Sequence, residues 1–449
     1  MSTRRKQAII FVGLAAIFVV AVVFVVPPLL NVDHYRPQVV AYLERVSGKK
    51  AEIGHLTLTI FPKVTIRVDE LGLKNPTEFP EGYFVTVRRI DAELAGRSLL
   101  HRQVIIKTLA MENPVINLIS DPDGPWNFEN PKSAIPGNIF SLGKISTVDI
   151  KGGQLSVSNL LPSDEPGVVF FEAHDVSGRL EQVDLRAFTD PDSSSTSPSF
   201  LGAEGNLKAT ALRFGSIHAK DVSSKIRLQA RDVFFTDVRG EAYDGNAAGD
   251  VSFDLAGKNP SFKTNARMKG INVAQLLATF PGGRGKMTGR MEGEVKLAGE
   301  IQHSTSPWAG IHGGGQVTVR NGQVPSLELN ANLVKLVHFN DLGPAKLEPS
   351  SFSFISTDWE LANQQIFSRR IDIDGYGVDV DGSGSISVNG SEKLNYQGIA
   401  KITTKQSFFK NILARLSGAT LEDGKLSFPF RVSGTLQNPI FTEGKEKGD

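Results

Sequence analysis

The stretch "LTLTIFPKVTIRV" (Leu56–Val68) contains two runs of alternating apolar and polar residues on either side of the turn Phe61-Pro62-Lys63. Successive side chains of a β-strand point to opposite faces, so each run places its apolar residues on one face. The sequence therefore predicts a β-hairpin with a single apolar face. The residues of that face are Leu56, Leu58, Ile60, Val64, Ile66 and Val68.

A short amphipathic helix is predicted directly before the hairpin, from Asp33 to about Ser47. Asp33 is a candidate N-cap, Pro37 falls near the first turn, and Gly48 is placed to end the helix. Helical spacing puts four apolar residues on one side of it: Val39, Val40, Leu43 and Val46.

Upstream of this helix, Ala8–Val26 ("AIIFVGLAAIFVVAVVFVV") contains only apolar residues and glycine. A helix of that length reaches about 28 Å, enough to cross the ~30 Å hydrocarbon core of a bilayer. Three cations precede the run, Arg4, Arg5 and Lys6. They favour a cytoplasmic segment 1–7, a transmembrane anchor over 8–30, and transfer of the rest across the membrane.

A cleaved signal peptide is the alternative interpretation of this segment. Its apolar core would be about 7–15 residues long and would end at a small-residue cleavage site. Here the run is longer and continues into Pro27-Pro28-Leu29-Leu30 without such a site. The sequence therefore favours an uncleaved anchor.

Strand-like alternation continues through most of the chain, giving roughly two dozen expected strands and about four soluble helices. Two further hairpins are predicted, over Ile145–Val157 with a turn at Gly152-Gly153 and over Val317–Val324 with a turn at Asn321-Gly322. Apolar residues at helical spacing predict the remaining short helices near residues 273–280, 329–336 and 408–416.

Four short helices cannot cover the apolar face of so much sheet. The sheet must fold onto itself as a sandwich or barrel, or curl and leave its face for an apolar ligand. We expect a mostly β chain in which the N-terminal transmembrane helix precedes an elongated, curled antiparallel β-sheet. Its predicted regions are 31–189 and 200–449, separated by the flexible loop "DPDSSSTSPS" at 190–199.

Composition and motifs argue against catalysis and against nucleic-acid binding. Lys+Arg (49) and Asp+Glu (48) nearly cancel, so no basic nucleic-acid surface is indicated. Cysteine is absent, and the eight histidines lack the spacing of a zinc site. No nucleophile elbow is present. We therefore expect neither enzymatic activity nor a cofactor.

One acidic segment, "DIDGYGVDVDGSG", allows two interpretations. If Gly375-Tyr376-Gly377 is a turn, Asp372 and Asp374 lie on one strand and Asp379 and Asp381 on the next. The carboxylates would then form a solvated hairpin face or a calcium site. Because the twelve-residue loop of an EF-hand and its terminal Glu are missing, the solvated face is favoured.

Five segments of the sequence resemble the AsmA-like proteins, which are inner-membrane-anchored envelope proteins of Gram-negative bacteria. The first is the anchor followed by residues 34–76, and the second, residues 98–128, ends in Trp126-Asn127-Phe128. The other three are "GEAYDGNAAGDVSFDL" (240–255), "INVAQLLATFPGGRGKMTGRMEGEVKLAGE" (271–300) and "LSFPFRVSGTLQNPIFTEG" (426–444).

This resemblance implies a role in outer-membrane biogenesis and a likeness to bridge-like lipid transfer proteins, whose β-groove holds acyl chains. It implies no catalytic residues. We expect phospholipid as the partner, possible envelope protein partners, and a chain that is periplasmic apart from its inner-membrane anchor. The six apolar hairpin residues would contact lipid at the membrane-proximal mouth of the groove. The alternative is a tethered scaffold for outer-membrane protein assembly, with a closed core.

Overall fold

The computed structural model describes residues 32–95, 106–121, 126–128, 144–160, 166–184, 201–229, 232–254, 261–280, 282–300, 309–328, 332–333, 336, 351–403 and 419–444. Strands dominate these residues and the helices are few and short, which confirms the expected mostly β class. The chain divides into two compact units. The first unit comprises Met1–Gly215 and Ser223–Ala230, and the second comprises Ser216–Val222 and Arg231–Asp449.

The described part of the first unit begins with the 3-10 helix η1 (Val32–Tyr35). The α-helix α3 (Arg36–Ser47) follows and precedes the strands. Its strands are β1 (Ala51–Glu52), β2 (His55–Thr59), β3 (Thr65–Lys74), β4 (Tyr83–Leu94), β5 (Ile106–Ser120), β6 (Lys144–Leu160), β7 (Pro166–Asp184) and β8 (Leu201–Phe214). Strand β9 (Ile217–Gln229) contributes residues to both units.

The second unit continues with β10 (Asp232–Ala242), β11 (Gly245–Asp254), β12 (Ser261–Asn272), α6 (Val273–Ala278), β13 (Arg290–Glu300), β14 (Ile311–Gln323), η2 (Pro325–Leu327), β15 (Ser351–Ala362), β16 (Gln365–Gly375), β17 (Val378–Ser387), β18 (Leu394–Thr403), β19 (Thr420–Glu422), β20 (Lys425–Gly434) and β21 (Pro439–Glu443). Helix α6 confirms the helix expected near residues 273–280.

Helix α3 confirms the helix expected before the first hairpin, but its N-terminal cap is not Asp33. Tyr35 occupies the cap position without a side-chain cap bond, and a proline lies in the first turn. The Asp33 Oδ1 atom instead accepts a hydrogen bond from the Leu56 backbone N–H at 3.0 Å. Gly48 ends the helix as expected, because its left-handed φ of 65° lets its N–H reach the Glu44 carbonyl.

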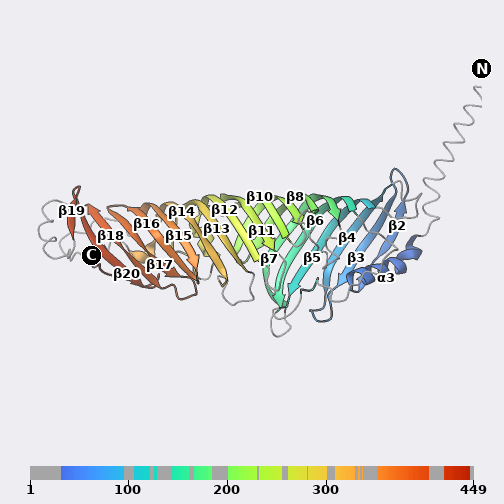
Figure 1. Cartoon of the computed structure of the whole chain (residues 1–449), viewed down its shortest axis with the longest axis horizontal. Helices are drawn as coiled ribbons and strands as arrows, with labels where there is room; N and C mark the ends of the chain where they lie inside the picture. The colour runs from blue at the N-terminus through green and yellow to red at the C-terminus, as the bar shows by residue number, and fades with distance from the viewer. Residues whose placement is uncertain are drawn as a thin grey trace, which may run out of the picture. The chain divides into compact units, whose positions relative to one another are not determined.

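The predicted hairpin at residues 56–68 is confirmed as β2 and β3, in antiparallel register. Strands β2 to β8 then pair in chain order, and each pair is antiparallel except for β5 and β6. Figure 1 shows these strands side by side, with α3 beside the first of them. The expectation of an antiparallel sheet therefore holds for this unit with one parallel pair.

That parallel pair corrects the hairpin predicted at Gly152-Gly153, because β6 runs through both glycines as one strand. Gly152 adopts a φ of 64° and produces an irregularity of register with β7 rather than a turn. A Cβ placed on Gly153 would meet Ile150 Cγ2 and Pro114 Cγ at 3.3 Å. Ile150 and Gly153 thus share a face although they are three residues apart, which interrupts the simple alternation.

The hairpin predicted at Asn321-Gly322 is also wrong. Strand β14 continues to Gln323 and pairs with β15 on either side of Asn321, which adopts a φ of 50° inside the strand. Asn and Gly tolerate the left-handed region wherever it occurs. The dipeptide therefore indicates a positive φ in this chain, and not a reversal of direction.

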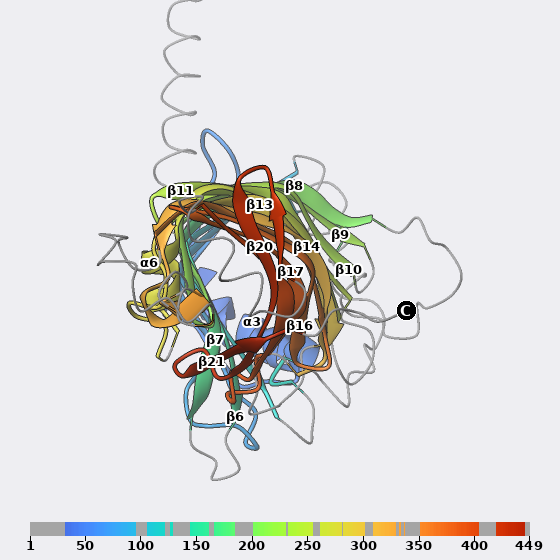
Figure 2. The ribbon, with the colours of Figure 1, turned by 90° about the vertical axis from the view of Figure 1, so that its left-hand side faces the viewer.

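In the second unit, the strands from β10 to β18 pair antiparallel with their chain neighbours, and β20 pairs with β18, β19 and β21. Figure 2 shows curved ribbons for the strands of this unit that it labels, among them β11, β13, β14, β16 and β17. The largest buried cluster of the described residues lies on β17, β18 and β20, and it includes Leu333.

Three expectations lie outside the described residues: the transmembrane anchor at 8–30, the loop at 190–199 and the helix near 408–416. Among the residues that are described, no helix has the length and apolar character needed to cross a membrane.

Candidate functional site

Four of the six apolar residues predicted to form the hairpin face lie on strands and oppose each other in pairs. Leu56 is paired with Val68, and Leu58 with Ile66. Ile60 and Val64 lie next to the turn, outside the strands. Leu56 is buried, with 7% of its surface exposed, whereas the other five side chains are only half-buried. That these residues contact lipid stays a prediction.

The strand register extends this apolar face across the first unit. One line of directly opposed residues runs from β3 to β6 through Val68, Ile90, Met111 and Ile150. A second line runs from β3 to β7 through Ile66, Ala92, Leu109, Val148 and Leu180. We call the surface that carries both lines the apolar face. Sequence reasoning identified its first strands only, because the alternation within a strand does not reveal which residues face each other.

The opposite face of the same strands carries ion pairs between neighbouring strands. In the first unit, Arg nitrogens lie 2.7–3.1 Å from carboxylate oxygens in the pairs Arg67–Asp91, Arg89–Asp69, Arg179–Asp149 and Arg213–Glu172. Arg67 lies between Ile66 and Val68 in sequence, so it points to the other side. Exposed pairs of this kind stabilise a fold little. They nevertheless identify the face that is in water.

The residues that the structure describes bury only part of the apolar face: Ala92 and Val148 of the second line are buried, and Val148 belongs to a buried cluster. Ile66, Val68, Ile90, Met111 and Ile150 are all half-buried rather than buried. Packing of this face against another sheet would bury such side chains in a core about 10 Å thick. The first unit therefore keeps apolar area in contact with solvent on one side of its sheet.

Glycines allow neighbouring backbones to approach closely on the apolar face, as the concave side of a curved sheet requires. Gly178 and Gly205 lie on it, opposite Ile150 and Leu180 respectively. A Cβ added to Gly178 would lie 2.2 Å from the Asn206 carbonyl oxygen, and one added to Gly205 would lie 2.0 Å from that of Arg179. Such close approach of neighbouring backbones marks a tight bend toward the face on which the Cβ would lie.

The second unit repeats both features. A line of opposed residues runs from β10 to β13 through Phe235, Val251, Thr264 and Leu297. Gly249, Gly293, Gly313 and Gly315 lie on the same face, and a Cβ on any of them would come within 2.0–2.2 Å of a carbonyl oxygen of an adjacent strand. The ion pairs Arg267–Glu294 (2.7 Å) and Arg320–Glu292 (2.9 Å) lie on the other face.

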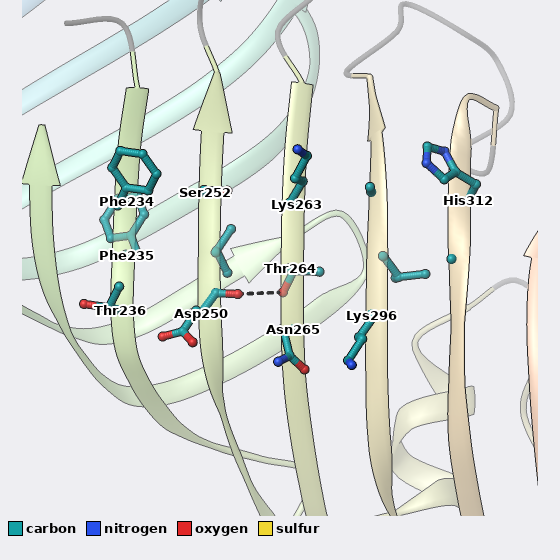
Figure 3. A pocket seen from close by; sticks show the side chains of 14 residues that line it. Phe234, Phe235, Thr236, Asp250, Ser252, Lys263, Thr264, Asn265, Lys296 and His312 are labelled. Atoms are coloured by element: carbon teal, nitrogen blue, oxygen red, sulfur yellow. Dashed lines mark hydrogen bonds between the residues drawn. The ribbon is translucent and has the colours of Figure 1, made fainter. Parts of the chain in front are cut away.

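A shallow pocket of about 540 Å³ lies over β10 to β14 of the second unit. Figure 3 shows Phe234 and Phe235 on one side of it and His312 on the other. The Thr264 hydroxyl donates to the Asp250 carbonyl oxygen at 3.2 Å (Figure 3). The volume of this pocket falls within the range of small-ligand sites, and Val251 and Leu297 supply part of its apolar lining.

The acidic residues of β16 and β17 do form the predicted hairpin, with Asp372 opposite Asp381 and Asp374 opposite Asp379. Asp379 is paired with Lys425, and Asp372 lies 2.7 Å from Arg370. A hydrogen bond with Asp372, followed by partial burial, raises the pKa of Asp381. Within the described part of the chain, no group of three or more acidic or histidine side chains could hold a metal ion.

The model of the AsmA family matches residues 1–134 of the chain. This match agrees with the resemblance seen in the sequence, and it contains the first two of the five resembling segments, including Trp126-Asn127-Phe128. The other three segments lie outside it. No curated protein and no solved structure matches the chain.

Proposed function

We propose, from the AsmA match over residues 1–134 and the partly uncovered apolar face, that this protein binds or conducts phospholipid between membranes. In this proposal the protein is not an enzyme. It is anchored in the bacterial inner membrane by residues 8–30, extends into the periplasm, and supports outer-membrane biogenesis.

The observation that carries the proposal is the pair of apolar lines on the concave side of the first unit. Acyl chains placed along Val68, Ile90, Met111 and Ile150 would remove half-exposed apolar surface from water. Each Å² of apolar area removed contributes about 25 cal/mol. The lipid headgroup would remain in water, and the ion-paired face would form the outside.

The proposed site supplies no energy to drive phospholipid in one direction. We infer that phospholipid moves along the apolar face down a gradient, or with the help of an envelope protein partner. The scaffold alternative requires a closed, dry core throughout the sheet. The half-buried residues of the first unit favour lipid binding over that alternative.

Carboxylates introduced on the apolar face test the proposal. Leu58 and Ile66 are half-buried and directly opposed, so an Asp at either position can reach water. We expect L58D and I66D to keep near-normal abundance and cooperative melting, yet to lose phospholipid that co-purifies with the full chain. The matched control T57D changes an exposed residue of the other face. Unfolding of both apolar-face variants would support the closed scaffold instead.

A further inference from the structure

The apolar face of the second unit is divided into two sections of different accessibility. Over β10 to β14, the side chains of Phe235, Val251, Leu297 and Val317 are half-buried. Over β17 to β20, those of Val378 and Phe428 are each 1% exposed. We call the surface over β10–β14 the open section and the surface over β17–β20 the sealed section.

The strand register shows that the two sections are one continuous face. Val319 on β14 is opposite Ile355 on β15, which is opposite Ile373 on β16. The line continues through Val380, Ala400 and Phe428 on β17, β18 and β20. The change in burial therefore occurs along a single apolar surface, and not between two sides of the sheet.

The transition between the sections extends over β14 to β16: Val319 on β14 is already buried (6% exposed), whereas Ile355 on β15 and Ile373 on β16 are still half-buried. Leu361 on β15 is opposite Gly313 of the open section, and it is 1% exposed. Phe352, near the other end of the strand, is buried together with Val273 of α6 and Val319. Trp359, between them, is still half-buried. Access to the apolar face is thus closed at the two ends of β15 and remains at its middle, and the large buried cluster begins at β17.

Large side chains fill the sealed section from within the second unit. Leu333 is fully buried in the cluster formed by β17, β18 and β20, and Leu336 packs against that cluster. Phe430 stacks on Phe441 with ring centroids 6.3 Å apart. Because the side chains of this cluster already exclude water from each other, an acyl chain would have to displace them in order to bind there.

We propose that acyl chains occupy the second unit only over the open section, and that the sealed section is a stop that ends the apolar track before β17. The inference rests on the proposed function and adds to it a limit on how far a lipid chain reaches. The second unit then holds the end of a chain, and it does not pass lipid onward through β20 unless the sealed cluster opens.

Photo-crosslinking of the full chain in cells tests this stop. A photoreactive phenylalanine analogue at Phe235 probes the open section, and the same analogue at Tyr396 probes the margin of the sealed cluster. Both native residues are aromatic, so the analogue changes the side chains little. Y396F controls for the hydrogen bond between Tyr396 and Ser368 (3.3 Å). A third probe at Ile66 reports lipid on the first unit.

We expect phospholipid adducts at positions 235 and 66, and a yield at least tenfold lower at position 396. In the variant L333A, which leaves a cavity in the cluster, the yield at position 396 should rise, and L336A provides a second, milder opening. Equal yields at 235 and 396 would overturn the stop and leave the proposed function standing. Adducts at 66 alone would overturn the open section as a binding surface. No lipid adduct at any of the three positions would overturn the proposed function itself.

Discussion

Asn127 and Asn75, 52 positions apart in sequence, are joined by a hydrogen bond in which the Asn127 Nδ2 atom donates to the Asn75 Oδ1 atom at 3.1 Å. Asn127 is fully buried. Its Nδ2 atom also donates to the Asn117 carbonyl oxygen at 2.8 Å, and its Oδ1 atom accepts from the Ile119 N–H at 3.0 Å. This side chain therefore ties the segment after β5 to the loop between β3 and β4.

Replacement of Asn127 should destabilise the first unit. N127L removes the amide while keeping similar bulk, and it leaves partly buried backbone groups of Asn117 and Ile119 without these partners. Each such group costs about 1–3 kcal/mol. Thermal or urea unfolding should show this loss. Equal stability of N127L and wild type would contradict a structural role for this bond network.

Glycine substitutions should show whether tight curvature needs a bare backbone on the concave side. In G315A the new Cβ would begin 2.0 Å from the Glu294 carbonyl oxygen, so strands β13 and β14 must separate. We expect a loss of at least about 1–3 kcal/mol, the usual cost of overpacking. In the control G240A the closest atoms are a Val222 methyl at 3.0 Å and the Lys220 carbonyl oxygen at 3.3 Å, so the new Cβ requires a much smaller displacement than in G315A. Similar unfolding midpoints for the two variants would argue against this explanation of the curvature.

The Asp372–Asp381 pair should make stability depend on acidic pH. The pKa of Asp381 is raised in the folded protein, chiefly by its hydrogen bond with Asp372. The folded state therefore binds the proton of the Asp381 carboxyl group more tightly than the unfolded state does. The stability that this protonation contributes is lost as pH rises through the raised pKa. D381N should stabilise the second unit at pH 7 by roughly 0.2–1 kcal/mol, the size of a cross-strand pair effect. Arg370 still pairs with Asp372 in this variant, so only the titration of Asp381 is removed. If the stability of D381N depends on pH in the same way as that of the wild type, the assignment to Asp381 is wrong.

Positions 56 and 58, which share the apolar face of strand β2, should lose different amounts of stability when a carboxylate is introduced. Leu56 is buried, and its backbone N–H is bonded to Asp33, whereas Leu58 is half-buried. L56D should lose about 2–5 kcal/mol from the lost leucine packing alone, and more from burial of the charge. L58D should remain folded. The two melting curves check this contrast, and equal destabilisation would mean that position 58 is as enclosed as position 56.

The local features of this fold could be predicted from the sequence, because adjacent residues determine them. Gly48 ends α3 and Pro62 lies in the turn between β2 and β3, as expected. Long-range features could not. Gly152 and Asn321 suit a hairpin turn and an in-strand positive φ equally well, and only pairing with distant strands decides between them.

The candidate site was likewise predicted only at its first strands. Alternation identified Leu58 and Ile66, but it gave no sign that Ile90, Met111 and Ile150 continue the line that begins at Val68. The concave side depends on backbone distances at residues such as Gly205, which no sequence pattern reports. The sealed section of the second unit depends on a buried cluster that brings Leu333 together with residues of β17, β18 and β20, which are distant from it in sequence.

Photo-crosslinking at four positions of the first hairpin, two on each face, tests most directly the central claim that phospholipid binds to the apolar face. The analogue is placed at Leu58 and Ile66 on the apolar face, and at Thr57 and Arg67 on the ion-paired face of the same two strands. Phospholipid adducts at 58 and 66, with none above background at 57 and 67, are the result that lipid binding on the apolar face predicts. Adducts only with protein at 58 and 66, or equal lipid yields at all four positions, would contradict it.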